Sequence, residues 1–206
     1  MIDHKEFIGQ VKRHKMTIED DNGVHRSILF KAPNTGNRHF RLTTWRGHLC
    51  ISGDMGSYVF SRLDDMFEFF RDDTGAGRIN PDYWSQKVQS EDKYSKVWQF
   101  SETAFREEVE RQTKDWETTL ENVDNLREAI EDATQYVENE NDAIAAMYDF
   151  SHDGHSFDTD DLSFKELGDH YLWDCRAIVW GIKQYDLFKQ GRTQADHDAK
   201  VLAGKL

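Results

Sequence analysis

Carboxylates recur at helical spacing through the middle of the chain, and they are the residues whose pattern most suggests a chemical role. One row holds Glu110, Glu117, Asp124, Glu131 and Glu138, and a second row holds Glu121, Glu128 and Asp142. On a helix that rises about 1.5 Å per residue, the two rows set a carboxylate roughly every 5 Å. Few Lys or Arg residues follow at the positions that would neutralise them. Such a surface imitates a run of phosphates and would attract a basic groove that otherwise holds nucleic acid.

The charge of the chain is concentrated in the same segment. The 206 residues carry a net charge of −13. Residues 101–142 hold fourteen Asp/Glu and four Lys/Arg, whereas residues 1–46 hold nine Lys/Arg and five Asp/Glu. A solvated helix face that only keeps the helix soluble is the simpler interpretation of this pattern. The functional interpretation predicts an acidic binding surface made by Glu110, Glu117, Glu121, Asp124, Glu128, Glu131 and Glu138.

The basic N-terminal portion supports a second hypothesis. It would act as a nucleic-acid or nucleotide-binding module through the basic face of the N-terminal sheet. Direct nucleic-acid binding is the less favoured of the two hypotheses. The residues that would form this surface are Lys12, Arg13, Lys15, Arg41, Trp45 and Arg46.

Histidines on successive predicted strands suggest a metal or acid–base site. His25, His39 and His48 would share one face of the sheet with Arg41 and Cys50. Three imidazoles on one face could bind Zn²⁺ or transfer protons. Half-buried histidines under a covering helix would show the same pattern, so a metal or catalytic site is not the favoured interpretation.

The segment DFSHDGHSFDTD, residues 149–160, partly matches a calcium-binding loop. It departs from that pattern at Ser156, where an apolar residue is expected, and at Asp160, where a bidentate Glu is usual. A polar connector is the favoured interpretation. The stretch TGAGR also lacks the Lys and Ser/Thr of a phosphate-binding loop. We therefore expect no cofactor and no metal, and a binding protein rather than an enzyme.

The elements that must position these residues form an α+β protein. Residues 1–100 are expected to fold as an antiparallel β-meander with flanking short helices. A hairpin around Asn22-Gly23 precedes the strands RHFRLTTW, HLCIS and SYVFSR, which are rich in β-branched and aromatic residues. Asp3 and Glu6 match the capping box of a first helix.

Residues 101–206 are expected to form a helical region. Val109, Trp116, Val123, Ile130, Val137 and Ile144 stand seven residues apart, as in a coiled coil. This repeat predicts one acidic helix over residues 101–148, or a hairpin if residues 139–141 break it. It would pair antiparallel with a buried helix over residues 162–190. A homodimer built on the same seam is an open alternative.

The sequence also predicts the compartment. No apolar run approaches the ~18 residues needed to cross a bilayer, and the start MIDHKEF does not match a secretory signal. Cys50 and Cys175 are not in a CxxC pair and are expected to be reduced. We therefore expect a cytoplasmic protein without a membrane partner.

Two blocks of sequence resemble uncharacterised proteins of tailed phages and prophages. They are RHFRLTTWRGHLCISGDMGSYVFSRLDDMFEFFR at residues 38–71 and YLWDCRAIVWGIKQYDLF at residues 171–188. The resemblance implies an accessory protein in a bacterial host cytoplasm, of a kind that often inhibits host defence, as anti-CRISPR proteins and DNA mimics do. The partner it implies is a host protein or ribonucleoprotein with a basic groove, plausibly a CRISPR effector complex.

Overall fold

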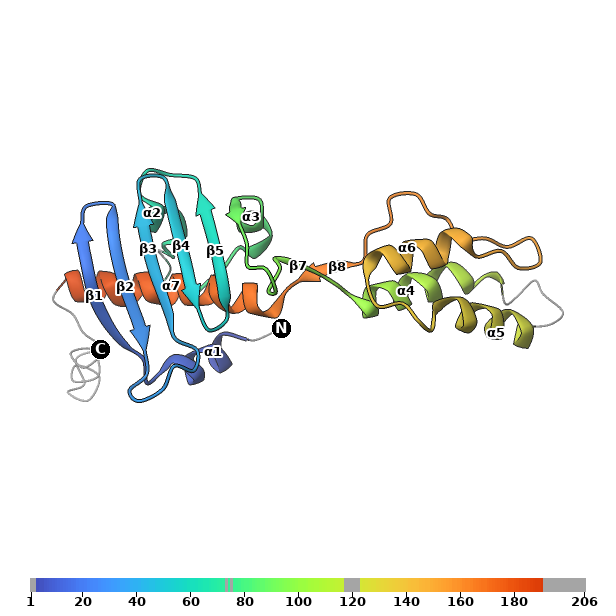
Figure 1. Ribbon diagram of the computed structural model, residues 1–206, viewed down its shortest axis with the longest axis horizontal. Helices are drawn as coiled ribbons and strands as arrows, with labels where there is room; N and C mark the ends of the chain where they lie inside the picture. The colour runs from blue at the N-terminus through green and yellow to red at the C-terminus, as the bar shows by residue number, and fades with distance from the viewer. Residues whose placement is uncertain (1–2, 73, 75, 117–122, 191–206) are drawn as a thin grey trace. The chain divides into compact units, whose positions relative to one another are not determined.

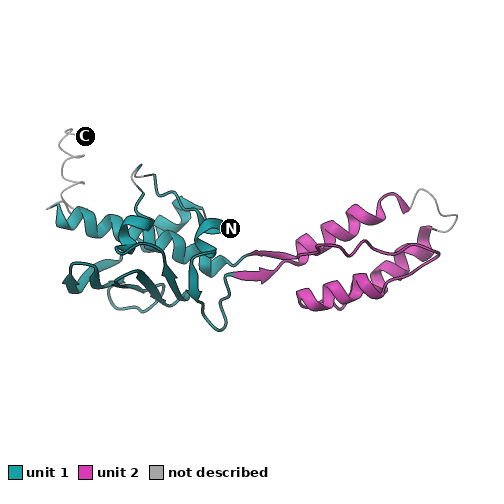
Figure 2. Ribbon diagram, turned by 90° about the horizontal axis from the view of Figure 1, so that it is seen from above, with its two compact units in different colours: residues 1–97, 167–206 teal, residues 98–166 magenta. Residues whose placement is uncertain are grey.

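The computed structural model describes residues 3–72, 74, 76–116 and 123–190. These residues form two compact units (Figure 2). Unit 1 consists of residues 1–97 and 167–206, and unit 2 consists of residues 98–166. In the order of the chain, unit 2 is therefore an insertion into unit 1.

Unit 1 contains a six-stranded antiparallel sheet in which every strand pairs with its neighbour in sequence (Figure 1). Its strands are β1 (Lys15–Asn22), β2 (His25–Lys31), β3 (Phe40–Trp45), β4 (His48–Gly53), β5 (Gly56–Ser61) and β6 (Val88–Ser90). The predicted meander is thus confirmed, and the short strand β6 is added to it.

Alternation along the strands produces one buried face and one half-buried face. Ile28, Leu42, Ile51 and Tyr58 pair across four strands and are fully buried. Their neighbours in sequence point to the opposite face, because successive side chains of a strand alternate. The β4–β5 turn also needs a glycine, since a Cβ at Gly53 would lie 2.2 Å from the His39 carbonyl oxygen.

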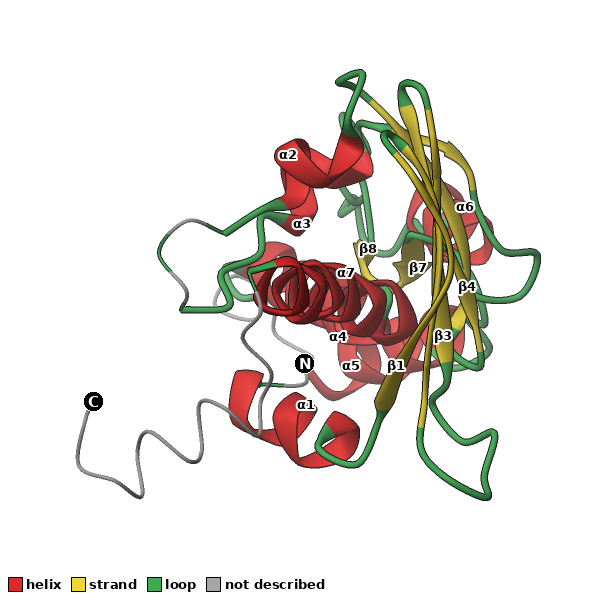
Figure 3. Ribbon diagram, turned by 90° about the vertical axis from the view of Figure 1, so that its left-hand side faces the viewer, coloured by secondary structure: helices red, strands yellow, loops and turns green. Residues whose placement is uncertain are grey.

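Helices of unit 1 cover the buried face of the sheet (Figure 3). They are α1 (His4–Val11), α2 (Met66–Phe70), α3 (Pro81–Ser85) and α7 (Asp169–Lys189). Asp3 caps α1 by accepting a hydrogen bond from the Glu6 amide at 2.7 Å, as the capping-box pattern predicted. The Trp173 ring of α7 packs against Phe7 and Phe40 at 5.3 and 5.8 Å between ring centroids.

An ion pair between buried Arg26 and half-buried Asp65 ties the sheet to α2. Arg26 on β2 donates two hydrogen bonds to the Asp65 carboxylate, at 2.9 and 2.8 Å, and its guanidinium lies 4.5 Å from the Phe67 ring centroid. Burial alone would raise the pKa of Asp65, but the hydrogen bonds from Arg26 and from the Phe67 amide lower it below its usual value. The pair is therefore charged on both sides.

Unit 2 is a small bundle of three helices that run in alternating directions (Figures 1 and 2). Its elements are β7 (Trp98–Phe100), α4 (Glu102–Thr113), α5 (Val123–Thr134), α6 (Glu140–Asp149) and β8 (Lys165–Leu167), with β7 paired to β8. Phe105, Leu126, Met147 and Phe164 are at the centre of its core. Unit 2 therefore has an apolar core of its own.

The predicted continuous helix over residues 101–148 is wrong. Helix α4 ends at Thr113, and Asn139 caps a new helix by accepting hydrogen bonds from the Asn141 and Asp142 amides. Residues of the seven-residue repeat instead pack together in the core of unit 2, where Val109 is buried and Trp116, Ile130, Val137 and Ile144 are partly buried. A seven-residue repeat requires a neighbouring helix that covers its apolar residues. Short helices that fold back on each other provide this cover as well as a second long helix would. The seam is thus used within one chain, which removes the basis for a coiled-coil homodimer.

The predicted helix over residues 162–190 and the domain division after residue 100 also need correction. Residues Lys165–Leu167 form a strand, and α7 begins only at Asp169. Helix α7 belongs to unit 1, where it packs against the sheet. Apolar residues surround α7 on most sides, so a single partner helix could not cover it. Among the described residues no helix combines the length and the apolar character needed to cross a bilayer.

Candidate functional site

The predicted acidic residues lie on separate elements of unit 2. Glu110 is exposed near the end of α4, and Asp124, Glu128 and Glu131 are exposed on α5, where their spacing places them on one side of the helix. Glu138 is exposed between α5 and α6. Glu117 and Glu121 lie outside the described residues. The described carboxylates therefore form no single straight row.

These carboxylates differ from several other acids of the unit in having no partner among the described residues. The side chains of Glu110, Asp124, Glu128, Glu131 and Glu138 make no hydrogen bond or ion pair within the part of the chain that the structure describes. Other carboxylates of the unit do make such bonds. Glu102 pairs with Arg106 at 2.8 Å, Glu108 with Arg111 at 2.5 Å and Glu140 with Lys165 at 2.6 Å.

The division into units sharpens the charge asymmetry that the sequence predicted. Unit 2 contains 20 Asp/Glu and 5 Lys/Arg, a net charge of −15. Unit 1 contains 19 Asp/Glu and 21 Lys/Arg, a net charge of +2. The excess acid of the whole chain is therefore carried by the inserted unit.

A groove between α4 and α5 lies beside these carboxylates. Its volume is about 260 Å³. Phe105 and Val109 from α4 and Ile130 from α5 supply apolar lining, and Glu110 and Glu131 lie at its edges. No pattern in the sequence predicted this groove, because it exists only where two short helices lie side by side.

The connector over residues 149–160 is part of the core of unit 2. His152 and His155 pair across a tight turn in which Asp153 and Gly154 take φ angles of 46° and 81°. The Trp116 ring stacks on His155 at 5.1 Å between centroids. In the described ranges, no group of three His, Cys, Asp or Glu side chains is placed to hold a metal ion.

The predicted basic surface is dispersed. Arg41 is on the half-buried face of the sheet, paired with Glu19, and Trp45 stacks on His48 at 5.0 Å between ring centroids. Lys12 ends α1 and lines a groove beside α7, on the helix-covered side of the sheet. The proposed single surface is therefore wrong, because Lys12 and Arg41 belong to opposite faces of the sheet.

The remaining residues of the predicted basic surface do not form one surface either. Arg46 lies 3.8 Å from Asp64, and both side chains are strongly exposed. Arg13 is exposed in the segment after α1. The sheet histidines are also separated, since His39 bonds the Gly36 carbonyl before β3 begins, whereas His48 lies beside Trp45 at the other end of that strand.

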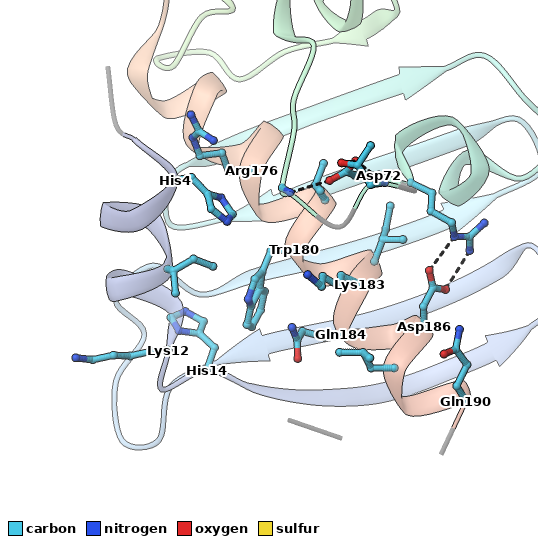
Figure 4. A pocket seen from close by; sticks show the side chains of 17 residues that line it. His4, Lys12, His14, Asp72, Arg176, Trp180, Lys183, Gln184, Asp186 and Gln190 are labelled. Atoms are coloured by element: carbon cyan, nitrogen blue, oxygen red, sulfur yellow. Dashed lines mark hydrogen bonds and ion pairs between the residues drawn. The ribbon is translucent and has the colours of Figure 1, made fainter. Parts of the chain in front are cut away.

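Unit 1 contains a larger groove that the sequence did not predict (Figure 4). It lies between α1, α7 and the segment after α2, and its volume is about 690 Å³. His4 and Arg176 lie close together near one end, and Trp180 and Lys183 lie between them and the Arg71–Asp186 pair (Figure 4).

The wall formed after α2 is held by its own hydrogen bonds. The Asp72 carboxylate accepts hydrogen bonds from the amides of Thr74, Gly77 and Arg78, at 2.7 to 3.1 Å. With the Thr74 hydroxyl, these bonds lower the pKa of Asp72 to about 2. Gly77 lies against His4, where a Cβ would be 2.2 Å from the ring. The φ angle of 70° at Gly77 favours glycine, and a larger residue would also displace the His4 ring.

Asp174 is the most deeply buried carboxyl of unit 1. It lies on α7 with 2% exposure, and its Oδ2 atom has no hydrogen-bond partner among the described residues. Burial raises the pKa of Asp174 well above its usual value, and the nearby Asp92 charge adds to the shift. Burial therefore favours the protonated, neutral form of Asp174.

Comparison of the chain with models of protein families, with curated proteins and with solved structures found no match.

Proposed function

We propose that the protein is a binding protein whose inserted unit 2 presents exposed carboxylates to a basic groove of a partner that otherwise holds nucleic acid. One observation carries the proposal. Glu110, Asp124, Glu128, Glu131 and Glu138 are exposed without a partner in the described part of a unit of net charge −15, while other acids of that unit are paired.

Unpaired acids at this density have a cost that a partner would relieve. Like charges one helical turn apart destabilise a helix by about 0.2–0.5 kcal/mol per pair. A basic partner surface would remove that repulsion and would also speed association through long-range attraction. Both effects weaken as salt is added.

The partner class follows from the resemblance of residues 38–71 and 171–188 to phage accessory proteins. The proposed role is a phage-encoded inhibitor, acting in the host cytoplasm on a nucleic-acid-handling defence complex of the CRISPR effector type. In this role the carboxylates take the place of nucleic-acid phosphates, and no catalytic step is needed.

The test is competition for nucleic acid. Purified CRISPR effector complexes are mixed with labelled target DNA and increasing amounts of the protein, and bound DNA is measured by mobility shift. We expect the protein to displace DNA from a susceptible complex. The triple variant Asp124→Lys, Glu128→Lys, Glu131→Lys should lose this activity.

A matched variant controls for net charge. Asp20→Lys, Glu68→Lys, Asp82→Lys makes the same charge change at exposed positions of unit 1, and it should still displace DNA. Equal activity of the two triple variants, or no displacement from any complex tested, contradicts the proposal.

The groove of unit 1 favours a second candidate function, which is binding of a nucleotide or a similar phosphorylated ring compound. Its volume of about 690 Å³ lies within the usual range for small-molecule sites. Arg176 and Lys183 supply positive charge beside the Trp180 ring. Calorimetric titration with ATP, AMP and inorganic phosphate tests this candidate. Trp180→Leu should weaken nucleotide binding, and Trp98→Leu, an exposed tryptophan of unit 2, should not.

A further inference from the structure

The groove between α4 and α5 has the size of a side-chain pocket. About 260 Å³ is less than the roughly 300–1,000 Å³ typical of sites for drug-sized ligands. Phe105 and Val109 are 1% and 9% exposed and Ile130 is half-buried, so an occupant would contact an apolar surface that is already packed against the core of unit 2. One large side chain is therefore a better fit than a whole metabolite.

The two threonine hydroxyls that line the groove need no hydrogen-bond partner from an occupant. The Thr113 hydroxyl donates to the Val109 carbonyl at 2.9 Å, and the Thr134 hydroxyl donates to the Ile130 carbonyl at 2.8 Å. Both hydroxyl protons are thus used within their own helices, as is common for Thr in a helix. An aliphatic or aromatic side chain can enter without leaving a buried donor unsatisfied.

The edges of the groove determine what flanks that side chain. Glu110 on α4 and Glu131 on α5 are exposed carboxylates without a partner in the described part of the chain, and Glu128 and Asp124 continue the acidic surface along α5. Two arginines also line the groove, and neither is free: Arg106 is paired with Glu102 at 2.8 Å, and Arg127 of α5 makes an interaction of its own. Residues that flank the inserted side chain would therefore gain most by being Lys or Arg.

From these observations we infer that the α4–α5 groove receives an aliphatic or aromatic side chain from a basic protein segment of the partner. The inference rests on the proposed function and adds to it. Charge brings the basic segment to unit 2, and one buried apolar anchor supplies affinity that salt does not screen. The groove thus favours a protein segment that carries an apolar side chain over nucleic acid and over a purely electrostatic contact.

Two synthetic peptides of equal charge test the inference. One is a helical peptide of Lys and Leu with Leu at every third or fourth position, and the other replaces each Leu by Ser. Binding to the whole protein is measured by fluorescence anisotropy at low and at physiological ionic strength. We expect the Leu peptide to bind at least about tenfold more tightly, as the burial of one large apolar side chain predicts.

Variants locate the anchor. Thr134→Met should fill the groove and remove most of the preference for the Leu peptide. Ala145→Met adds the same side chain at an exposed position of α6 and should preserve the preference. The double variant Glu110→Gln, Glu131→Gln should weaken both peptides and reduce the salt dependence. Circular dichroism melts of each variant identify any loss of folding.

The outcomes separate this inference from the function on which it rests. Equal binding of the two peptides to the unmodified protein, with weakening of both by Glu110→Gln, Glu131→Gln, overturns the groove and leaves the acidic surface in place. If a folded Thr134→Met variant still prefers the Leu peptide, the groove is not the binding site and the inference is also overturned. Failure of both peptides to bind contradicts both proposals. Self-association that Thr134→Met abolishes would show that a second copy fills the groove, which overturns the inference as well.

Discussion

The two units of the chain use charge in opposite ways. In unit 1, ion pairs join segments far apart in sequence, as in Arg26–Asp65, Arg71–Asp186 and Lys189–Asp21. In unit 2, Glu102–Arg106 and Glu108–Arg111 link residues within about one helical turn, and Glu140–Lys165 joins more distant segments. Many other acids of unit 2 have no partner in the described residues. Charges in unit 1 therefore help to hold its elements together, and charges in unit 2 remain available to another molecule.

The two cores differ in the same direction. In unit 1, aromatic rings of α1, β3 and α7 pack edge to face, as in Phe7–Trp173 and Phe40–Trp173. The core of unit 2 is smaller and leaves the groove of about 260 Å³ between α4 and α5. Unit 1 also contains a groove, of about 690 Å³, so the two cores differ in size and in aromatic packing and not in the presence of an open site.

The largest expected loss of stability comes from breaking an ion pair in unit 1. Arg26→Ala leaves the Asp65 carboxylate without its partner and removes the guanidinium from the Phe67 ring. We expect the free energy of unfolding of unit 1 to fall by about 3 kcal/mol, the scale for breaking a buried pair on one side. Urea titration followed by tryptophan fluorescence measures it.

The matched change in unit 2 is Arg106→Ala, which removes an exposed pair. It should change stability by less than about 0.5 kcal/mol. Similar losses in the two variants would remove the contrast between structural and available charge.

A second prediction concerns the carboxyl group buried in unit 1. Because burial raises the pKa of Asp174, the native state holds this proton to higher pH than the unfolded chain does. Above the ordinary carboxyl pKa the unfolded state therefore binds fewer protons, and stability falls as pH rises. Asp174→Asn removes this dependence and should stabilise unit 1 by about 1 kcal/mol at neutral pH.

The pH dependence distinguishes this cause from a packing effect. The advantage of Asp174→Asn should grow with pH, by at most about 1.4 kcal/mol per pH unit, from the ordinary carboxyl pKa up to the raised pKa of Asp174. Thermal melts between mildly acidic and mildly basic pH measure it. A difference that does not change with pH would mean that Asp174 is ionised in the folded protein.

The smallest expected effect sharpens the description of unit 2. Glu131 lies in the last turn of α5, three residues after Glu128, so both the helix dipole and its neighbour disfavour its charge. Glu131→Gln should stabilise unit 2 by about 0.5 kcal/mol at low salt. The gain should shrink as salt is added. A gain that is independent of salt would show that charge repulsion is not the cause.

The sequence by itself determined much of the local structure. Alternation of buried and exposed residues and turn residues such as Gly47 identified the strands of the meander, because period and turn chemistry are local properties. The acidic segment was also evident, since charge is a property of composition. The cap at Asp3 was predicted from its own side chain and confirmed.

Only the tertiary structure decided which faces meet. A repeat of seven residues specifies an apolar seam but not its partner, so one long helix and three short ones were both compatible with Val109, Ile130 and Ile144. Helix α7 packs on a sheet that ends far before it in sequence, and the α4–α5 groove depends on two helices lying side by side. These are long-range arrangements of surfaces, and local spacing does not encode the choice among partners of similar apolar character.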